Sequence, residues 1–306
     1  MSLENYEILE KCGEGAYSIV YKAKEKKTGV LVAVKGSFKS MRYRDAEMRE
    51  SRVKEIRSLQ KLQNKNVIKL LHWDNWDNTV INLTSAYLVF PYCPLTINSL
   101  CVKHELTEEQ KKACIRMFLE GLDYIHSQGI IHRDISARNI LIDEFGVVKI
   151  ADFGSVWMES DTDEKKGTLS SDVGTRFYRA PELFFSASNY TNAIDLWSIG
   201  CVVAEFFTEP VGSHLFQGET DILHICKVFH VLGVPNDTTW PEMKTLPDYG
   251  KIEFIPSPTD GLTKSEHLPN ASTNESVEFV KKFLVYESSK RLSTKKNLIH
   301  PIEMQM

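Results

Sequence analysis

The chain has 306 residues and a formal net charge of −4, and 42% of its residues are apolar and 25% charged. This composition is typical of a globular protein and excludes a wholly disordered one. At about 150 residues per domain, the length allows roughly two domains, with a core that needs no disulfide or structural metal. The acidic balance argues against non-specific nucleic-acid binding, which depends on a cationic surface.

Cysteine usage and the apolar stretches predict the compartment. The six cysteines form no C-x-x-C pair, which favours reduced thiols in a reducing compartment. No basic stretch followed by an apolar run opens the chain, and the longest apolar stretch, near 199–207, is far shorter than the ~20 residues of a membrane-spanning helix. We therefore expect an intracellular protein, in the cytoplasm, the nucleus or both, with neither a membrane nor a nucleic acid as partner.

The first ninety residues predict a β-rich unit with one helix. The helix spans roughly 44–62, where Val53, Ile56 and Leu59 recur on one face of a heavily charged segment. Two prolines at 91 and 94 then predict a hinge. Short β-rich runs separated by turns predict strands at 6–9, 19–23, 31–35, 67–71 and 86–90.

The rest of the chain predicts helices. Thr107 and Gln110 have the spacing of a capping box at a helix start. Residues 193–207 are apolar almost all round, which predicts a buried helix. A further helix is predicted at 220–232 and a last one around 277–283, with irregular chain between them where the prolines gather.

Three motifs in the middle of the chain carry the chemistry. The pattern H-R-D-x-x-x-x-N occupies 132–139, D-F-G occupies 152–154 and A-P-E occupies 180–182. In this order and at these separations they resemble the motifs of eukaryotic protein kinases. The resemblance covers essentially the whole chain, 6–301.

The resemblance implies an α+β fold, the two-lobed protein kinase fold, in a single kinase domain over 1–306. It implies a β-rich N-lobe at 1–90, a hinge at 91–95 and a mainly helical C-lobe at 96–306. The implied reaction transfers the γ-phosphoryl group of ATP to a protein hydroxyl with the help of Mg²⁺.

The kinase pattern also implies roles for individual residues. Asp134 accepts the proton of the substrate hydroxyl, while Lys35 binds the α- and β-phosphates and Glu55 pairs with Lys35. Asp152 and Asn139 supply oxygen ligands to Mg²⁺, a hard cation. The implied nucleotide-binding residues are Cys12, Gly13, Glu14, Gly15, Ala16, Tyr17, Ser18, Val20, Ala33, Lys35, Glu55, Phe90, Pro91, Cys93 and Leu141.

Three supporting features follow from the same pattern. Asp195 should tie the buried helix to the catalytic loop, and Arg291 should pair with Glu182. A stack of Leu59, Leu70, His132 and Phe153 should form a spine between the lobes.

Within the kinases, the chain most resembles the cyclin-dependent kinases. Segments that match that group include G-E-G-A-Y at 13–17, R-F-Y-R-A-P-E at 176–182 and C-V-V-A-E at 201–205. The cyclin-binding helix signature is absent from 48–54, which departs from the group.

The catalytic loop departs from the Ser/Thr pattern. The usual lysine two residues after Asp134 is Ser136, so Arg138 is predicted to supply the missing cation, as in the A-A-R-N motif of tyrosine kinases. That leaves a tyrosine or dual-specificity enzyme as an alternative. Thr175 favours a Ser/Thr kinase, because its hydroxyl can bridge the base and the cation.

Regulatory positions are also altered. Ser170 stands where the cyclin-dependent kinases carry a phosphorylated threonine, whose phosphate three arginines hold. Only Arg133 remains here, with Lys54 and Trp157 at the other two positions. Acidic residues at 159–164 are either a solvated loop or a built-in surrogate for phosphate. Tyr17 is either an inhibitory phosphorylation site or a packing aromatic.

A chain with these departures should be active as a monomer without a cyclin. It resembles the fungal single-polypeptide CDK-activating kinases, which implies that its protein substrates are cyclin-dependent kinases and that it acts in cell-cycle control. The alternatives are a cyclin-dependent kinase that needs a cyclin, a dual-specificity kinase, and a pseudokinase scaffold, for which Ser18 and Ser136 are the only grounds.

Overall fold

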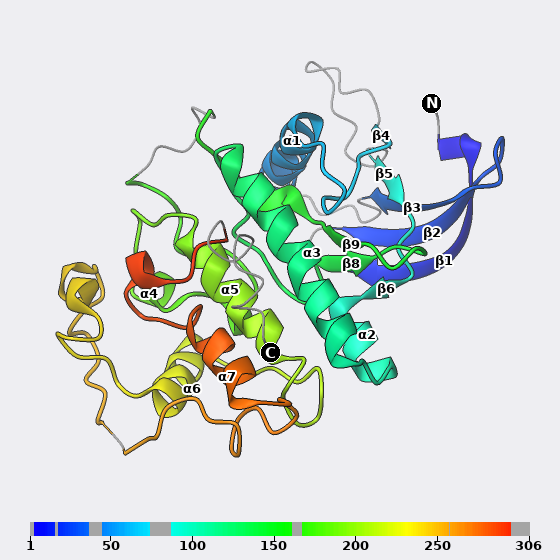
Figure 1. Ribbon diagram of the computed structural model, residues 1–306. Helices are drawn as coiled ribbons and strands as arrows, with labels where there is room; N and C mark the ends of the chain where they lie inside the picture. Colours follow the sequence, from blue (N-terminus) through cyan, green and yellow to red (C-terminus); the bar gives the residue numbers. More distant parts are fainter. Residues whose placement is uncertain are drawn as a thin grey trace.

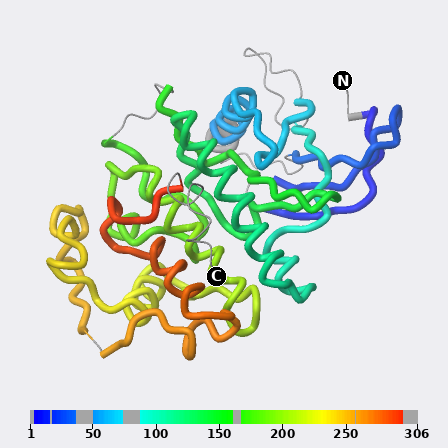
Figure 2. Tube along the Cα trace, in the orientation of Figure 1, coloured from blue at the N-terminus to red at the C-terminus, as the bar shows by residue number. Residues whose placement is uncertain are grey.

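The computed structural model describes residues 3–15, 18–36, 45–73, 87–160, 167–256 and 258–294. The chain folds into two lobes (Figures 1 and 2). The blue-to-cyan strands and α1 form one lobe, and the green-to-red helices form the other lobe. Both the β-rich first lobe and the helical second lobe match the fold predicted from the sequence.

A five-stranded antiparallel sheet with the order β1-β2-β3-β5-β4 builds the N-lobe. One face of this sheet carries its own small hydrophobic cluster, made by Tyr6, Ala23, Val32, Val34, Tyr87 and Val89. The other face looks toward the C-lobe. The strands are β1 (Tyr6–Glu14), β2 (Ile19–Glu25), β3 (Leu31–Gly36), β4 (His72–Trp73) and β5 (Tyr87–Pro91).

Helix α1 (Asp45–Lys61) is the helix predicted at 44–62, and residue 44 lies outside the described residues. Its apolar residues Ile56 and Leu59 are buried in a second cluster that continues without a break into the C-lobe. One large core therefore crosses the boundary between the lobes.

The prediction of a strand at 67–71 is wrong. Val67 makes only an isolated bridge with Ile150, and the Ile68 N–H donates to the Ile150 carbonyl at 2.9 Å. Both side chains are buried between the lobes, so the apolar run reflects burial rather than a strand in the sheet. The predicted strand at 86–90 corresponds to β5, and residue 86 lies outside the described residues.

The C-lobe is built on α3 (Glu108–Ser127) and α5 (Ala193–Ala204), which lie side by side in Figure 1. Thr107 caps α3 in the predicted capping box, because its hydroxyl accepts from the Gln110 N–H and the Gln110 side chain accepts from the Thr107 N–H. Every residue of α5 is buried, as its apolar pattern predicts, but the helix ends at Ala204 and not at the predicted residue 207.

Short elements complete this lobe. The helices are α2 (Ile97–Lys103), α4 (Pro181–Phe184), α6 (Asp221–Leu232) and α7 (Asn274–Lys281). In the part of the chain that the structure describes, 3-10 helices occur at Leu3–Asn5, Phe153–Ser155, Arg176–Tyr178, Pro241–Thr245 and Ser288–Lys290. The small strands are β6 (Leu95–Thr96), β7 (Ile130–Ile131), β8 (Ile140–Ile142), β9 (Val148–Ile150) and β10 (Trp157–Met158).

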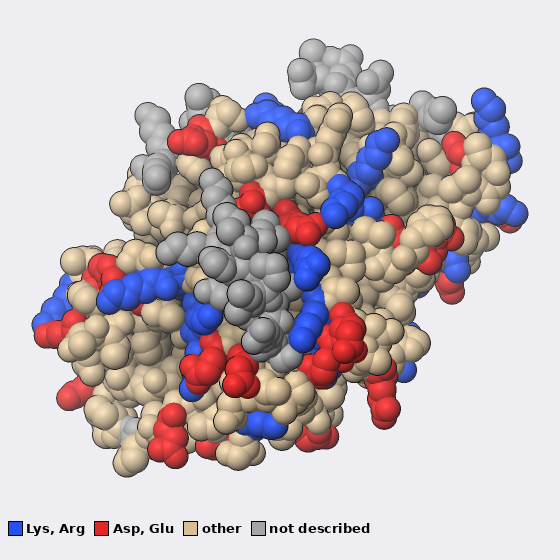
Figure 3. All heavy atoms as spheres, in the orientation of Figure 1, with Lys and Arg blue, Asp and Glu red and all other residues tan. Residues whose placement is uncertain are grey.

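Acidic and basic side chains are interspersed on the face of the molecule drawn in Figure 3. This mixture agrees with the small net charge. Within the described ranges, no helix has the length and the apolar character to cross a membrane.

Candidate active site

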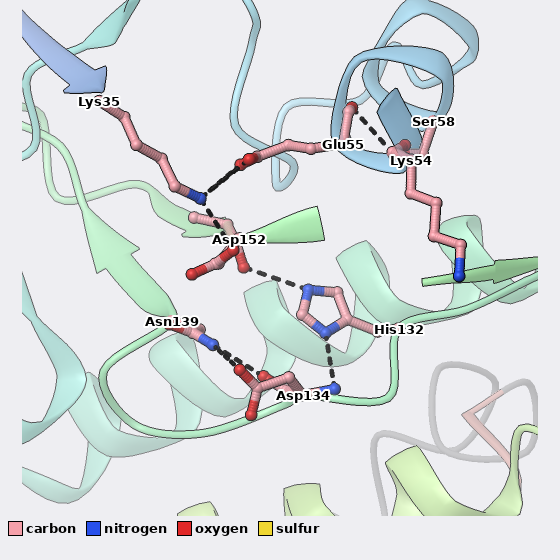
Figure 4. A network of polar contacts seen from close by, with 9 residues as sticks. Lys35, Lys54, Glu55, Ser58, His132, Asp134, Asn139 and Asp152 are labelled. Atoms are coloured by element: carbon pink, nitrogen blue, oxygen red, sulfur yellow. Dashed lines mark hydrogen bonds and ion pairs between the residues drawn. The ribbon is translucent and has the colours of Figure 1, made fainter. Parts of the chain in front are cut away.

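A lysine and two carboxylates meet between the lobes (Figure 4). The Lys35 Nζ, at the end of β3, lies 2.9 Å from both Oε atoms of Glu55 on α1. It also lies 2.9 Å from Asp152 Oδ1, which follows β9 in the C-lobe. Three elements from two lobes therefore converge on one ammonium group.

Charge and burial shift the pKa values of these three groups. Burial alone would lower the pKa of Lys35, but the carboxylates of Asp152 and Glu55 outweigh it and raise that pKa above its ordinary value. Lys35 lowers the pKa of Asp152, whereas burial raises the pKa of Glu55 against the opposing effect of Lys35. Lys35 is thus held as a fixed cation, which suits a group that binds phosphate.

The backbone at 152–154 holds Asp152 in place. Asp152 adopts a left-handed conformation with φ 65°, which is uncommon outside glycine. A Cβ on Gly154 would lie 2.4 Å from the Ser51 Oγ of α1. Helix α1 therefore packs closely on this segment, and a side chain at 154 would displace the Ser51 hydroxyl.

Asp134 lies at the centre of a second group of contacts. Its Oδ1 accepts hydrogen bonds from both the N–H and the hydroxyl of Thr175, each at 2.8 Å. Asn139 Nδ2 donates to the Asp134 Oδ2 and to its carbonyl, both at 2.9 Å. Burial raises the pKa of Asp134, while the Thr175 hydroxyl opposes that rise and the nearby Asp152 adds to it. A carboxylate with a raised pKa accepts a proton more readily.

Asp195, in α5, supports the loop that carries Asp134. Its carboxylate accepts from the N–H groups of His132 and Arg133, both at 2.8 Å, as the sequence predicts. The His132 ring packs edge-on against Phe153 with centroids 4.9 Å apart, and both side chains are fully buried. Leu59 is buried and Leu70 half-buried in the same large core, and the stacking of all four spine residues stays a prediction.

Asp152 and Asn139 fit the chemistry of a magnesium site. Because Asn139 Nδ2 donates to Asp134, its amide oxygen is turned away from Asp134. One carboxylate and one amide oxygen are hard ligands of the kind that Mg²⁺ takes, together with waters and phosphates.

Four of the predicted nucleotide-binding residues share one face of the N-lobe sheet: Val20, Ala33, Lys35 and Phe90. Val20 lies opposite Lys35 in the register of β2 and β3, and Ala33 lies opposite Phe90 in that of β3 and β5. Side chains opposite each other, or two apart on one strand, share a face. Leu141, on β8, is half-buried in the core that joins the lobes.

The loop between β1 and β2 closes with a hydrogen bond from the Gly15 N–H to the Ser18 carbonyl at 2.8 Å. Gly13 and Glu14 lie in β1 opposite Val20 and Ile19. Ala16 and Tyr17 lie outside the described residues.

Cys12, in β1, is exposed. Cys93 is half-buried just after β5, where burial raises the pKa of its thiol to about 11. Pro91 ends β5 opposite Val32.

Arg138 is exposed, and no hydrogen bond or ion pair joins it to another described residue. It lies near enough to Glu205 to lower the pKa of that carboxyl against the effect of burial. Its role as the missing cation stays a prediction. Ser136 is buried and accepts the Asn139 N–H at 3.0 Å through its carbonyl, so it shapes the loop.

The predicted pair of Glu182 and Arg291 is present as a fork. The Nη1 and Nη2 atoms of Arg291 lie 2.6 and 2.7 Å from the two carboxylate oxygens, and both residues are buried. Bidentate pairs of this kind fix orientation as well as contribute energy. The residues from the D-F-G motif to the A-P-E motif, 152–182, form the activation segment. The pair joins the end of this segment to the C-terminal part of the lobe.

Around the predicted regulatory position, Ser170 is exposed and Arg133 is buried. Lys54 forms an ion pair with Glu50 at 2.6 Å, and Trp157 pairs with Ile131 between β10 and β7. Residues 161–166, which hold most of the predicted acidic surrogate, lie outside the described residues.

Two side chains in this region make contacts that the sequence did not predict. Tyr190 links Arg133 to the Ser170 carbonyl through its hydroxyl. Arg179 Nη2 donates to the Gly174 carbonyl at 3.1 Å. Neither Tyr190 nor Arg179 belongs to a motif whose spacing predicts these partners.

Comparisons with known proteins agree with this geometry. Residues 6–302 match the family described as protein kinase domain. Cyclin-dependent kinase 20 from Danio rerio is 38% identical over 302 residues, which covers 98% of this chain and 83% of that protein. Cyclin-dependent kinase 20 from Homo sapiens is 35% identical over 305 residues, with 97% and 82% covered. A crystal structure of the yeast RNA Pol II CTD kinase CTDK-1 complex is similar with a TM-score of 0.81 and 26% identity, covering 97% of this chain and 92% of that one.

Proposed function

Because this chain belongs to the protein kinase family, and within it to the cyclin-dependent kinases, it is a protein serine/threonine kinase, and we propose that Asp134, Lys35 and Asp152 carry its reaction. The observation that carries the proposal is a pair of contact groups. Figure 4 shows the Lys35 ammonium between the carboxylates of Glu55 and Asp152, and beside them the Asp134 carboxylate with Asn139. The Thr175 hydroxyl donates to the same Asp134 carboxylate, whose pKa burial raises.

The steps follow from these positions. Lys35 binds the phosphates of ATP, and Glu55 keeps its ammonium in place. Asp134 orients the substrate hydroxyl and takes its proton, while the hydroxyl oxygen bonds to the γ-phosphorus and the bond from that phosphorus to ADP breaks. Asp152 and Asn139 would hold Mg²⁺, which supplies positive charge to the phosphates when bound.

Replacing the base separates catalysis from nucleotide binding. Asp134→Asn should lose most of its turnover, while the dissociation constant for ATP changes little because the phosphate-binding groups remain. Asp260→Asn, at an exposed carboxylate far from the site in sequence, is the matched control and should keep full turnover. Unchanged turnover in Asp134→Asn would rule out the assigned base.

We also propose that the kinase acts without a cyclin. The support is that the cyclin-binding helix signature is absent from 48–54. The phosphate-binding position also has two of its three arginines replaced, by Lys54 and Trp157. Activity of the purified, phosphatase-treated chain tests this, and a large stimulation by a stoichiometric cyclin would contradict it.

The proposed substrate is the activation loop of other cyclin-dependent kinases. The support is the resemblance to single-polypeptide CDK-activating kinases together with the altered regulatory positions. Incubating the chain with ATP and a panel of inactive cyclin-dependent kinases, each with its activation-loop acceptor intact or replaced by alanine, tests the proposal. Phosphate incorporation that does not depend on that acceptor would refute it.

A second substrate class is favoured by Gly174. Its φ is +79°, and its carbonyl already accepts from Arg179 at 3.1 Å. Gly174 adjoins Thr175, whose hydroxyl donates to Asp134, so we infer that the substrate residue after the acceptor hydroxyl passes close to Gly174. A residue whose N–H needs that carbonyl would be left without a partner, so proline, which has no N–H, is favoured. Matched peptides with proline or alanine after the acceptor serine measure this preference.

A further inference from the structure

Two adjacent residues of the activation segment, Leu169 and Ser170, form hydrogen bonds with the chain just before α5. The N–H of Leu169, whose side chain is buried, donates to the Ser188 carbonyl at 3.0 Å. The hydroxyl of Tyr190 donates to the Ser170 carbonyl at 2.7 Å. The backbone is therefore fixed at the residue where the family carries its activating phosphate.

The same hydroxyl also contacts Arg133. Arg133 Nη1 donates to the Tyr190 Oη at 3.3 Å, and Tyr190 is buried. The other guanidinium nitrogens donate to the carbonyls of Ser155 and Val156, at 2.5 and 3.1 Å. A continuous path of hydrogen bonds thus joins the start of the activation segment to Ser170.

A tyrosine hydroxyl can link these groups without carrying charge. It accepts from the guanidinium and donates to a carbonyl at the same time, whereas a phosphate only accepts and needs several cations around it. Lys54 is already paired with Glu50, and Trp157 offers no cation. The surroundings therefore suit a neutral link better than a phosphate.

We propose that Tyr190 is a positioning residue that holds the activation segment in its substrate-accepting conformation, in place of a phosphate on Ser170. This inference rests on the proposed function as a kinase that is active without phosphorylation. Thr175, whose hydroxyl donates to Asp134, lies five residues beyond Ser170. Fixing Ser170 therefore limits how far Thr175 can move from the base.

Tyr190→Phe tests the proposal, because it removes only the hydroxyl and keeps the buried ring. The matched control is Tyr286→Phe, which removes a buried hydroxyl that donates to the Gly233 carbonyl at 2.6 Å away from the site. For unphosphorylated Tyr190→Phe we expect kcat to fall about tenfold, which corresponds to about 1.4 kcal/mol, with the KM for ATP within twofold of wild type. Tyr286→Phe should lower the melting temperature to a similar extent and leave kcat unchanged.

A second measurement does not depend on activity. Amide hydrogen exchange at Leu169 and through 167–175 should be faster in Tyr190→Phe and unchanged in Tyr286→Phe. If the wild-type chain phosphorylates no substrate, faster exchange in Tyr190→Phe would still support the inference while the proposed function fails. Exchange at the wild-type rate, or a kcat equal to that of wild type, would overturn the inference.

Discussion

Thr175 offers a quantitative test of how Asp134 is prepared for catalysis. Thr175→Val keeps the β-branched shape but removes the hydroxyl that donates to Asp134 Oδ1 at 2.8 Å. A hydrogen bond to a charged group contributes about 1.5–3 kcal/mol, or roughly 10- to 150-fold in rate. The Thr175 N–H still donates to the same oxygen, so we expect the low end of that range, about a 10- to 30-fold fall in kcat.

The pH dependence gives the same test a second readout. Burial raises the pKa of Asp134, and the Thr175 hydroxyl opposes the rise by donating to the charged form. Removing the hydroxyl should raise this pKa further. Because the base works only when deprotonated, the acid limb of the pH profile of kcat/KM should move to higher pH.

Steady-state kinetics with a peptide substrate at several pH values measures both effects. Thr175→Ser keeps the hydroxyl and is the control that should retain the wild-type acid limb. An acid limb in Thr175→Val that coincides with that of wild type would show that this hydroxyl does not act on the base.

Arg291→Met should lower the free energy of unfolding, measured in urea, by about 3–5 kcal/mol, because it leaves the buried Glu182 carboxylate unpaired. Gly174→Ala should lower kcat at saturating ATP, because φ is +79° and a Cβ would lie 2.6 Å from the Arg133 carbonyl oxygen; wild-type kinetics would contradict this. Ser170→Ala should keep most of the activity, and a fall of a hundredfold or more, about 2.7 kcal/mol, would show that a phosphate switch operates.

Much of the site could be predicted because its chemistry is fixed by short motifs. The resemblance of these motifs to those of protein kinases implied the roles of Lys35, Glu55, Asp134, Asn139 and Asp152, and the structure brings these residues together. These motifs are informative because Lys35 lies at the end of a strand and Asp134, Asn139 and Asp152 lie in short loops next to strands, where the local chain positions the side chain. The capping box of α3 was predictable for the same local reason.

The features that were missed depend on contacts between distant residues. Tyr190 meets Arg133 across 57 residues of sequence and Ser170 across 20, and no local pattern encodes either contact. The run at 67–71 was misjudged because burial between two lobes produces the same apolar sequence as a buried strand.

The two hydrophobic clusters have a consequence for how the molecule unfolds. Among the described residues, the outer face of the N-lobe sheet carries a cluster of six buried residues, whereas α1 and the inner side of the sheet share the large core of the C-lobe. Cooperative units with few buried contacts come apart at the lowest free energy. The outer strands β1 and β2 should therefore separate first, while α1 stays attached to the C-lobe. Nucleotide bound against β1 and β2 would stabilise this weaker unit by mass action. The first step of unfolding should thus become slower and less frequent as the ATP concentration rises.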